Sequence, residues 1–176
     1  MHIFLQGPRN VGKSTVIRKT LDILAVESPL EIGGFFTWNG GKGNPYIFMK
    51  SARNNGEGEI YRIAHFDESK GGLKCDIEVF EREGVRLLNA SRKSELIIMD
   101  ELGYLESDAP MFKQAVLNLV SGQAPVYGVL RLGDVPWHDA IKRNPLVKLV
   151  DVNKDNRDVL PQKLAGMLRA VRKSES

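Results

Sequence analysis

Residues 3–15 read Ile3-Phe4-Leu5-Gln6-Gly7-Pro8-Arg9-Asn10-Val11-Gly12-Lys13-Ser14-Thr15, an apolar run followed at once by a glycine-bracketed loop. The run predicts a buried strand, and the loop matches the G-x-x-x-x-G-K-[ST] pattern of a phosphate-binding loop, the Walker A motif. Glycine at both ends lets the backbone curl closely enough for its N–H groups to surround the phosphates of a nucleotide. The stretch therefore predicts nucleotide binding by residues 7–15.

The residues after the second glycine each have an expected task. Lys13 supplies a positive charge between the β- and γ-phosphates, and the Ser14 hydroxyl is a ligand for Mg²⁺. A helix that begins at Lys13 directs the positive end of its dipole at the bound anion. Its apolar face recurs at helical spacing, over Val16, Ile17, Thr20, Leu21 and Leu24.

Length and composition favour a single domain over residues 1–176. A chain of 176 residues can bury one two-sided core but is short for two. The 25 basic and 22 acidic residues are scattered and give a net charge of only +3, so charge does not indicate a nucleic-acid partner. No apolar run approaches the ~20 residues that a membrane span needs.

Cysteine and histidine usage bears on the cellular compartment and on metal binding. Cys75 is the single cysteine, which excludes an intramolecular disulfide, and no charged-then-apolar leader follows Met1. These features favour a reducing cytoplasm. The histidines, at positions 2, 65 and 138, are far apart and lack the paired spacing of metal ligands, so we expect no transition-metal site built from them.

The middle third of the chain is expected to form an antiparallel meander at one edge of a sheet. Strands are expected over residues 32–38, 46–49 and 59–65, because strand-forming residues gather there between glycine-containing breaks. The breaks at 39–45 and 53–58 are short, and short connections imply antiparallel pairing. Residues 66–74 are polar and contain glycine, so we expect a loop there.

The second half of the chain alternates helices and strands. Helices are expected over 76–89, from a cap at Ser107 or Asp108 to Gly122, over 137–142, and from about Asn156 to a polar tail at 173–176. Strands are expected over 95–101, 125–131 and 147–152. This alternation predicts a three-layer α/β fold of the P-loop type with a mostly parallel central sheet.

Two details of these helices are open to test. Gly84 weakens the first of them, unless a neighbouring element packs closely there. The buried stripe of the second is expected to comprise Met111, Phe112, Ala115, Val116, Leu119 and Val120.

The apolar run Ile97-Ile98-Met99 ends in the acid pair Asp100-Glu101. We expect this strand to lie beside the phosphate loop and to point its last side chains at the γ-phosphate. Asp100, the Walker B acid, is then expected to hold Mg²⁺ together with Ser14, and Glu101 to orient and deprotonate the attacking water. Two acids that simply end a strand at the surface are the plainer interpretation, but the loop favours the functional one.

Four pieces of the sequence together resemble a known family, the P-loop nucleoside-triphosphatases of the THEP type. They are the loop at 7–15, Gly34-Phe35-Phe36-Thr37, Ile97-Ile98-Met99-Asp100-Glu101-Leu102-Gly103, and Asn156-Arg157-Asp158. They occur in family order and span nearly the whole chain. The loop and the acid pair are shared with many ATPases, whereas the Gly-Phe-x-Thr and Asn-Arg-Asp pieces make the likeness specific.

The resemblance implies a monomeric or weakly associated enzyme that hydrolyses ATP, GTP and other nucleoside triphosphates to diphosphates, with Mg²⁺ and little base selectivity. The family usually has a Glu and an Arg soon after Gly-Phe-x-Thr, where this sequence has Trp38-Asn39-Gly40-Gly41. Arg131, at the end of the next strand, either supplies the transition-state charge instead or is a solvated strand-end residue.

Several assignments stay open on the sequence alone. Asn156 and Arg157 either cover the base, or Asn156 caps the last helix. Arg9 either lies over the phosphates or faces water. One other function is a small-molecule or nucleotide kinase, for which the candidate acceptor-site residues are Arg53, Arg62, Arg131 and Arg143. Another is a nucleotide-dependent switch that presents the meander to another macromolecule, with the protein partner unknown. A water-activating Glu101 argues against a kinase, because it would waste ATP.

Overall fold

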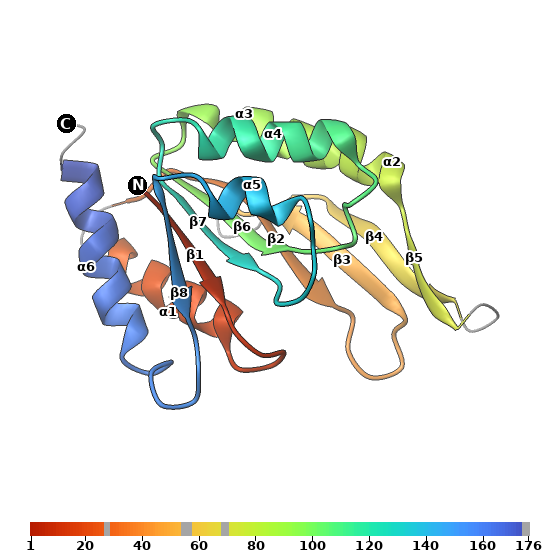
Figure 1. The fold of residues 1–176 in the computed structure, drawn as a ribbon, viewed down its shortest axis with the longest axis horizontal. Helices are drawn as coiled ribbons and strands as arrows, with labels where there is room; N and C mark the ends of the chain where they lie inside the picture. The colour runs from red at the N-terminus through yellow and green to blue at the C-terminus, as the bar shows by residue number, and fades with distance from the viewer. Residues whose placement is uncertain (27–28, 54–57, 68–70, 174–176) are drawn as a thin grey trace.

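The computed structural model describes residues 1–26, 29–53, 58–67 and 71–173, which build one mixed sheet with helices on both faces (Figure 1). The strands are β1 (His2–Gln6), β2 (Ile32–Asn39), β3 (Tyr46–Ser51), β4 (Ile60–Asp67), β5 (Gly72–Cys75), β6 (Leu96–Leu102), β7 (Val126–Leu130) and β8 (Val147–Asp151). The helices are α1 (Lys13–Ala25), α2 (Ile77–Val79), α3 (Val85–Ala90), α4 (Pro110–Val120), α5 (His138–Lys142) and α6 (Leu160–Lys173).

The strand order is β5-β4-β3-β2-β6-β7-β1-β8. Strands β2, β6, β7, β1 and β8 pair in parallel, while β3, β4 and β5 continue the sheet as an antiparallel meander. The expected three-layer P-loop fold, with its parallel centre and antiparallel edge, is confirmed. One detail differs: β7 lies between β1 and β6, so the acid pair is one strand further from the phosphate loop than expected.

Two apolar cores, one on each face of the sheet, hold the layers together. Helices α3, α4 and α5 cover one face, where the core includes Phe35, Phe80 and Phe112 (Figure 1). Helices α1 and α6 cover the other face, where the core includes Ile17 and Leu164. Strands β1, β6 and β7 are almost wholly buried because both of their faces are covered, as the uninterrupted apolar runs predict.

The expected loop at 66–74 is wrong at both ends. Strand β4 continues to Asp67, and Gly72–Cys75 forms the edge strand β5, which pairs Phe66 with Leu73 and His65 with Lys74. Strand β5 has only four residues and begins with glycine, so a search for apolar alternation misses it. Residues 68–70 lie outside the described part of the chain, as do 54–57 of the expected 53–58 connection and 174–176 of the expected tail.

The expected helix over 76–89 is interrupted by a π-helical turn at Phe80–Gly84. Asp76 caps its start by accepting a hydrogen bond from the Val79 N–H. A Cβ added at Gly84 would lie 2.6 Å from Cδ2 of Phe112. The glycine is therefore explained by the close approach of α4, the second of the two possibilities that the sequence left open.

Helix α4 has no side-chain cap of its own, so the expectation of Ser107 or Asp108 as its cap is wrong. Instead, the Glu81 carboxylate accepts hydrogen bonds from the Met111 and Phe112 N–H groups, at 2.9 and 3.3 Å. An acid from another helix therefore satisfies the free amides and faces the positive end of the dipole. Met111 is 59% exposed and does not belong to the buried stripe; the other five expected residues are buried.

The last helix begins at Leu160 rather than near Asn156. Pro161 has no N–H to donate, so it belongs in the first turn of a helix, where that donor has no partner anyway. Residues 154–159 form turns that Asn153 and Asn156 stabilise with their side chains.

Candidate active site

The phosphate-loop segment connects β1 to α1 in a backbone conformation that depends on its glycines. Gly7 and Gly12 have φ angles of 154° and 108°, and Asn10 adopts a left-handed φ of 61°. A Cβ added at Gly7 would clash with the Val152 carbonyl oxygen, so the loop leaves β1 directly against the end of β8. The curled backbone is the one that the motif predicts.

Lys13 is nearly buried and turns back over this loop. Its Nζ donates to the carbonyl oxygens of Gly7 and Pro8, at 2.9 and 3.0 Å. Burial lowers the pKa of the Lys13 ammonium, while the charges of Glu101 and Asp100 act to raise it. The ammonium therefore lies at the loop, near enough to both acids for their charges to act on it.

Ser14 and Asp100 form an oxygen-donor pair behind the loop. The Ser14 hydroxyl donates to Oδ1 of Asp100 at 3.2 Å, and only 2% of Asp100 is exposed. Burial raises the pKa of the Asp100 carboxyl to about 7, although the Ser14 hydrogen bond opposes the shift. Mg²⁺ prefers hard oxygen ligands, and a cation here would offset the cost of a buried charge. The pair therefore fits the ion that the sequence predicts.

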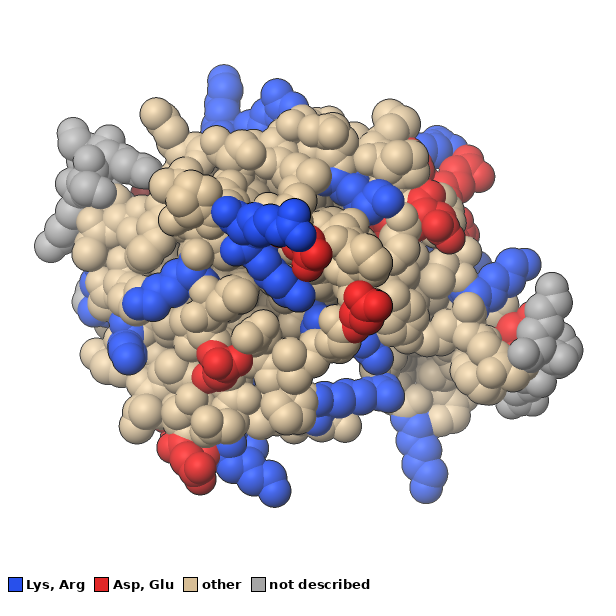
Figure 2. All heavy atoms as spheres, viewed as in Figure 1, with Lys and Arg blue, Asp and Glu red and all other residues tan. Residues whose placement is uncertain are grey.

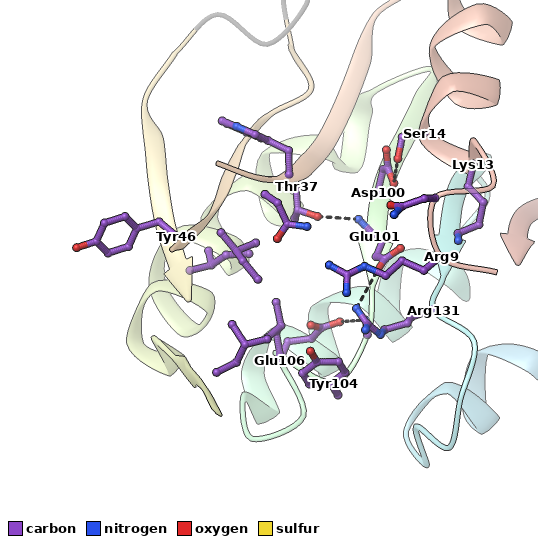
Figure 3. Close-up of a pocket in the computed structure, with 18 of the residues that line it drawn as sticks. Arg9, Lys13, Ser14, Thr37, Tyr46, Asp100, Glu101, Tyr104, Glu106 and Arg131 are labelled. Atoms are coloured by element: carbon purple, nitrogen blue, oxygen red, sulfur yellow. Dashed lines mark hydrogen bonds and ion pairs between the residues drawn. The ribbon is translucent and has the colours of Figure 1, made fainter. Parts of the chain in front are cut away.

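Glu101 lies on the open side of the same strand end. Its backbone N–H donates to Oγ1 of Thr37 at 3.1 Å, and its carboxylate lies 3.5 Å from Nη1 of Arg131 (Figure 3). The Arg131 guanidinium also lies 4.6 Å from the centre of the Tyr104 ring, a cation–π contact. About a third of each side chain of the Glu101–Arg131 pair is exposed, so both can reach a ligand.

These groups line one cleft of about 1060 Å³ at the carboxyl ends of the parallel strands. Arg9 projects from the phosphate loop into it, toward Glu101 and Arg131 (Figure 3). The cleft is also lined by Trp38, Asn39 and Gly41, from the segment that departs from the family pattern. Figure 2 shows the molecule hollowed between the loop after β1 and the β2–β3 connection, with Lys and Arg side chains at the edge of the hollow.

The structure does not bring every expected site residue into this cleft. Most of the loop lines it, together with Asp100, Glu101 and Arg131, but Pro8, Val11, Asn156 and Arg157 do not. Arg157 packs on the outside of the loop and donates to the Val11 carbonyl at 3.4 Å. Asn156 accepts from the Asn153 N–H and donates to the Asp151 carbonyl, so its side chain is already committed to the turn after β8.

Among the residues that line the cleft but were not expected as site residues are Arg18, Tyr104 and Glu106. Glu106 is 2% exposed, and its carboxylate accepts a hydrogen bond from the Gly103 N–H at 2.5 Å. No short pattern marks an acid five residues after Glu101. Of the arginines considered for a kinase acceptor site, Arg131 alone lines the cleft within the described residues; Arg53, Arg62 and Arg143 lie elsewhere.

The chain is similar to known proteins over nearly its whole length. A family model described as NTPase matches residues 2–165. The chain is 26% identical over 171 residues to nucleoside-triphosphatase THEP1 of Natranaerobius thermophilus, covering 93% of this chain and 94% of that protein. It is 26% identical over 192 residues to the cancer-related nucleoside-triphosphatase homolog of Mus musculus, covering 97% and 98%. The crystal structure of THEP1 from Aquifex aeolicus shares the fold, with a TM-score of 0.79, 23% identity, and 96% and 99% of the chains covered.

Proposed function

Because the chain belongs to the NTPase family of enzymes, we propose that it hydrolyses nucleoside 5′-triphosphates, ATP and GTP among them, to diphosphate and phosphate in a Mg²⁺-dependent reaction with little base selectivity. The observation that supports the proposal most is the convergence of Lys13, the Ser14–Asp100 pair and Glu101 in one cleft. Each is a group that phosphoryl transfer to water requires, and they come from segments far apart in the sequence.

In this proposal the phosphate loop binds the triphosphate. The N–H groups of residues 7–15 and the amino end of α1 surround the β- and γ-phosphates. Lys13, which contacts two loop carbonyls in the ligand-free structure, exchanges them for phosphate oxygens. Arg9 covers the outer side of the phosphates from its position in the cleft.

Ser14 and Asp100 would hold Mg²⁺, which when bound would neutralise charge on the phosphates. The two residues come from different elements that meet behind the loop: Ser14 lies at the start of α1, and Asp100 lies near the carboxyl end of β6.

Glu101 orients the attacking water and accepts its proton while the water oxygen bonds to the γ-phosphorus and the bond to the β,γ-bridging oxygen breaks. Arg131 holds the Glu101 carboxylate in place before the reaction, at 3.5 Å, and stabilises the charge that spreads over the γ-phosphoryl oxygens. The open side of the strand end leaves room for the water.

Low base selectivity follows from what surrounds the outer end of the loop. A guanine reader of the Asn-Lys-x-Asp type needs a free carboxylate, whereas the turn Asn153-Lys154-Asp155-Asn156 ends in an amide that already bonds to backbone groups. Arg157, against the loop, offers a planar surface on which any base can stack.

We also propose that the enzyme works in the cytoplasm. Within the described ranges, no helix has the length and apolar character of a membrane span.

Phosphate release from a panel of nucleoside triphosphates, with and without Mg²⁺ and without any added acceptor, tests the proposal. Lys13→Ala is expected to abolish turnover with little change in the thermal unfolding of the apo protein, while Lys19→Ala, at an exposed position on the same helix, serves as the matched control. A preference of more than about a hundredfold, or roughly 2.7 kcal/mol, for one base would contradict the low selectivity.

Two other outcomes would redirect the assignment. Release that requires an acceptor alcohol or nucleotide would indicate a kinase. A rate that rises only when a macromolecular partner is added would indicate a switch.

A further inference from the structure

Glu106 is a buried carboxylate to which the proposed reaction gives no task. It lines the cleft beside Glu101 and Arg131 (Figure 3), yet only 2% of it is exposed. Acids are almost never so deeply buried unless they are paired, since desolvation disfavours their charge. Its burial therefore calls for an explanation in the contacts that it makes.

Those contacts fix the turn that follows the acid pair. The Glu106 carboxylate accepts from the Gly103 N–H at 2.5 Å, and Nε1 of Trp137 donates to the carbonyl oxygen of Gly103 at 3.0 Å. Both polar groups of this glycine are therefore bound, one from within the turn and one from the residue that precedes α5. Gly103 is two residues from Glu101, so its orientation constrains the strand end.

The same turn also fixes the partner of Glu101. The Arg131 N–H donates to the Leu102 carbonyl at 2.9 Å, and the Arg131 guanidinium packs on Tyr104 while it pairs with Glu101. A shift of the turn would therefore move the carboxylate, the guanidinium and the ring together. A displacement of about 1 Å at reacting groups can cost on the order of a hundredfold in rate.

We propose that Glu106 is a positioning residue: by binding the Gly103 N–H from inside the protein, it holds the turn over residues 102–106 so that Glu101, paired with Arg131, faces the γ-phosphate. It acts through hydrogen-bond acceptance rather than by touching the substrate. The inference rests on the proposed function, because it gives Glu106 a role only if Glu101 activates water.

The first experiment compares three variants in the full chain. Glu106→Gln keeps an oxygen that can accept from Gly103, Glu106→Ala removes it, and Asp108→Ala removes an exposed acid two residues away as the matched control. We expect Glu106→Ala to lower kcat by about 10- to 100-fold with KM changed less than about threefold, and Glu106→Gln to stay within about fivefold of the parent. Asp108→Ala should match the parent.

A double-mutant cycle with Glu101→Gln separates positioning from general stability. If Glu106 acts through Glu101, adding Glu106→Ala to Glu101→Gln should lower kcat by less than about threefold, because the base is already absent. Each kcat is normalised to the fraction of folded protein that binds nucleotide, since Glu106→Ala also leaves the Gly103 N–H unpaired and lowers stability.

The outcomes distinguish this inference from the proposed function. Parent-like kcat in folded Glu106→Ala, equal losses in Glu106→Gln and Glu106→Ala, or full additivity in the cycle would each overturn the positioning role while hydrolysis itself stands. A parent protein that releases no phosphate, or a Glu101→Gln variant with parent activity, would instead overturn the reaction or its base.

Discussion

At the level of single residues, Asp100 and Glu101 are adjacent but lie in different surroundings. Asp100 is buried against Ser14, whereas about a third of the Glu101 side chain is exposed to the cleft. One acid is therefore suited to a buried cation, and the other to a water in the cleft.

Isosteric amides at the two positions should therefore fail in different ways. Glu101→Gln should lower kcat by about 10²–10⁴-fold with nucleotide affinity kept, because only proton acceptance is lost. Asp100→Asn should weaken the hold on Mg²⁺, so raising Mg²⁺ should restore part of its rate. Measurements of kcat and nucleotide affinity across a Mg²⁺ titration check both. If Glu101→Gln hydrolyses within a few-fold of the parent, water activation belongs to another group.

Single residues were predictable where a local pattern carries the chemistry. The loop residues and the acid pair are recognisable because phosphate binding needs a fixed spacing of glycine, lysine and hydroxyl. The pairing of Arg131 with Glu101 and the burial of Glu106 depend on how two strand ends meet, so a local stretch of sequence cannot predict either of them. For the same reason the sequence left Asn156 between two roles, and only the turn shows its bonds.

At the level of elements, predictions failed where tertiary contacts replace local signals. Strand β5 is a four-residue edge strand that begins with glycine, and α4 begins without its own cap because Glu81 of a neighbouring helix supplies one. Propensity rules miss such a short edge strand, and capping rules, which consider only neighbouring residues, miss a cap from a distant part of the chain. The start of α6 was within reach, since Pro161 by itself indicates a first turn.

The packing of α4 on the π-helical turn gives an element-scale prediction. Gly84→Ala places a methyl group 2.6 Å from Cδ2 of the fully buried Phe112 ring, so it should destabilise the fold by about 1–3 kcal/mol. Gly166→Ala, in α6, is the matched control: its Cβ meets no atom within 4 Å among the described residues, so it should stabilise the helix by about 0.5–1 kcal/mol. Denaturant unfolding measures both, and equal effects at the two sites would contradict the close approach.

At the scale of the whole molecule, the alternation of apolar runs and amphipathic stretches predicted the layers, because a strand buried on both faces must be covered by helices. The strand order was not predictable in the same way. Strand β7 lies between β1 and β6 because of how the chain crosses from one strand to the next, and hydrophobic periodicity does not determine those crossovers.

The interior also makes stability depend on pH through His138. This side chain is fully buried, and neither ring nitrogen has a hydrogen-bond partner among the described residues. Burial, with a smaller contribution from the Lys142 charge, lowers the pKa of His138 to about 4, against an opposing effect of Asp139. The folded protein thus keeps the imidazole neutral at pH values where the unfolded chain, with an ordinary pKa of about 6.5, takes up a proton.

The sign follows from proton binding: between pH 6.5 and 4 the unfolded state binds more protons, so the free energy of unfolding falls as pH falls. His138→Phe keeps a flat ring against Trp137 and loses no hydrogen bond. Relative to this variant, the parent should lose about 1.4 kcal/mol per pH unit from pH 6.5 down toward 4, reaching roughly 3 kcal/mol, with a constant difference above pH 7. Urea unfolding of both proteins at half-unit steps measures the difference directly, without interference from groups that the two share. A difference that stays flat from pH 7 to 4 would mean that water reaches His138 in the folded protein.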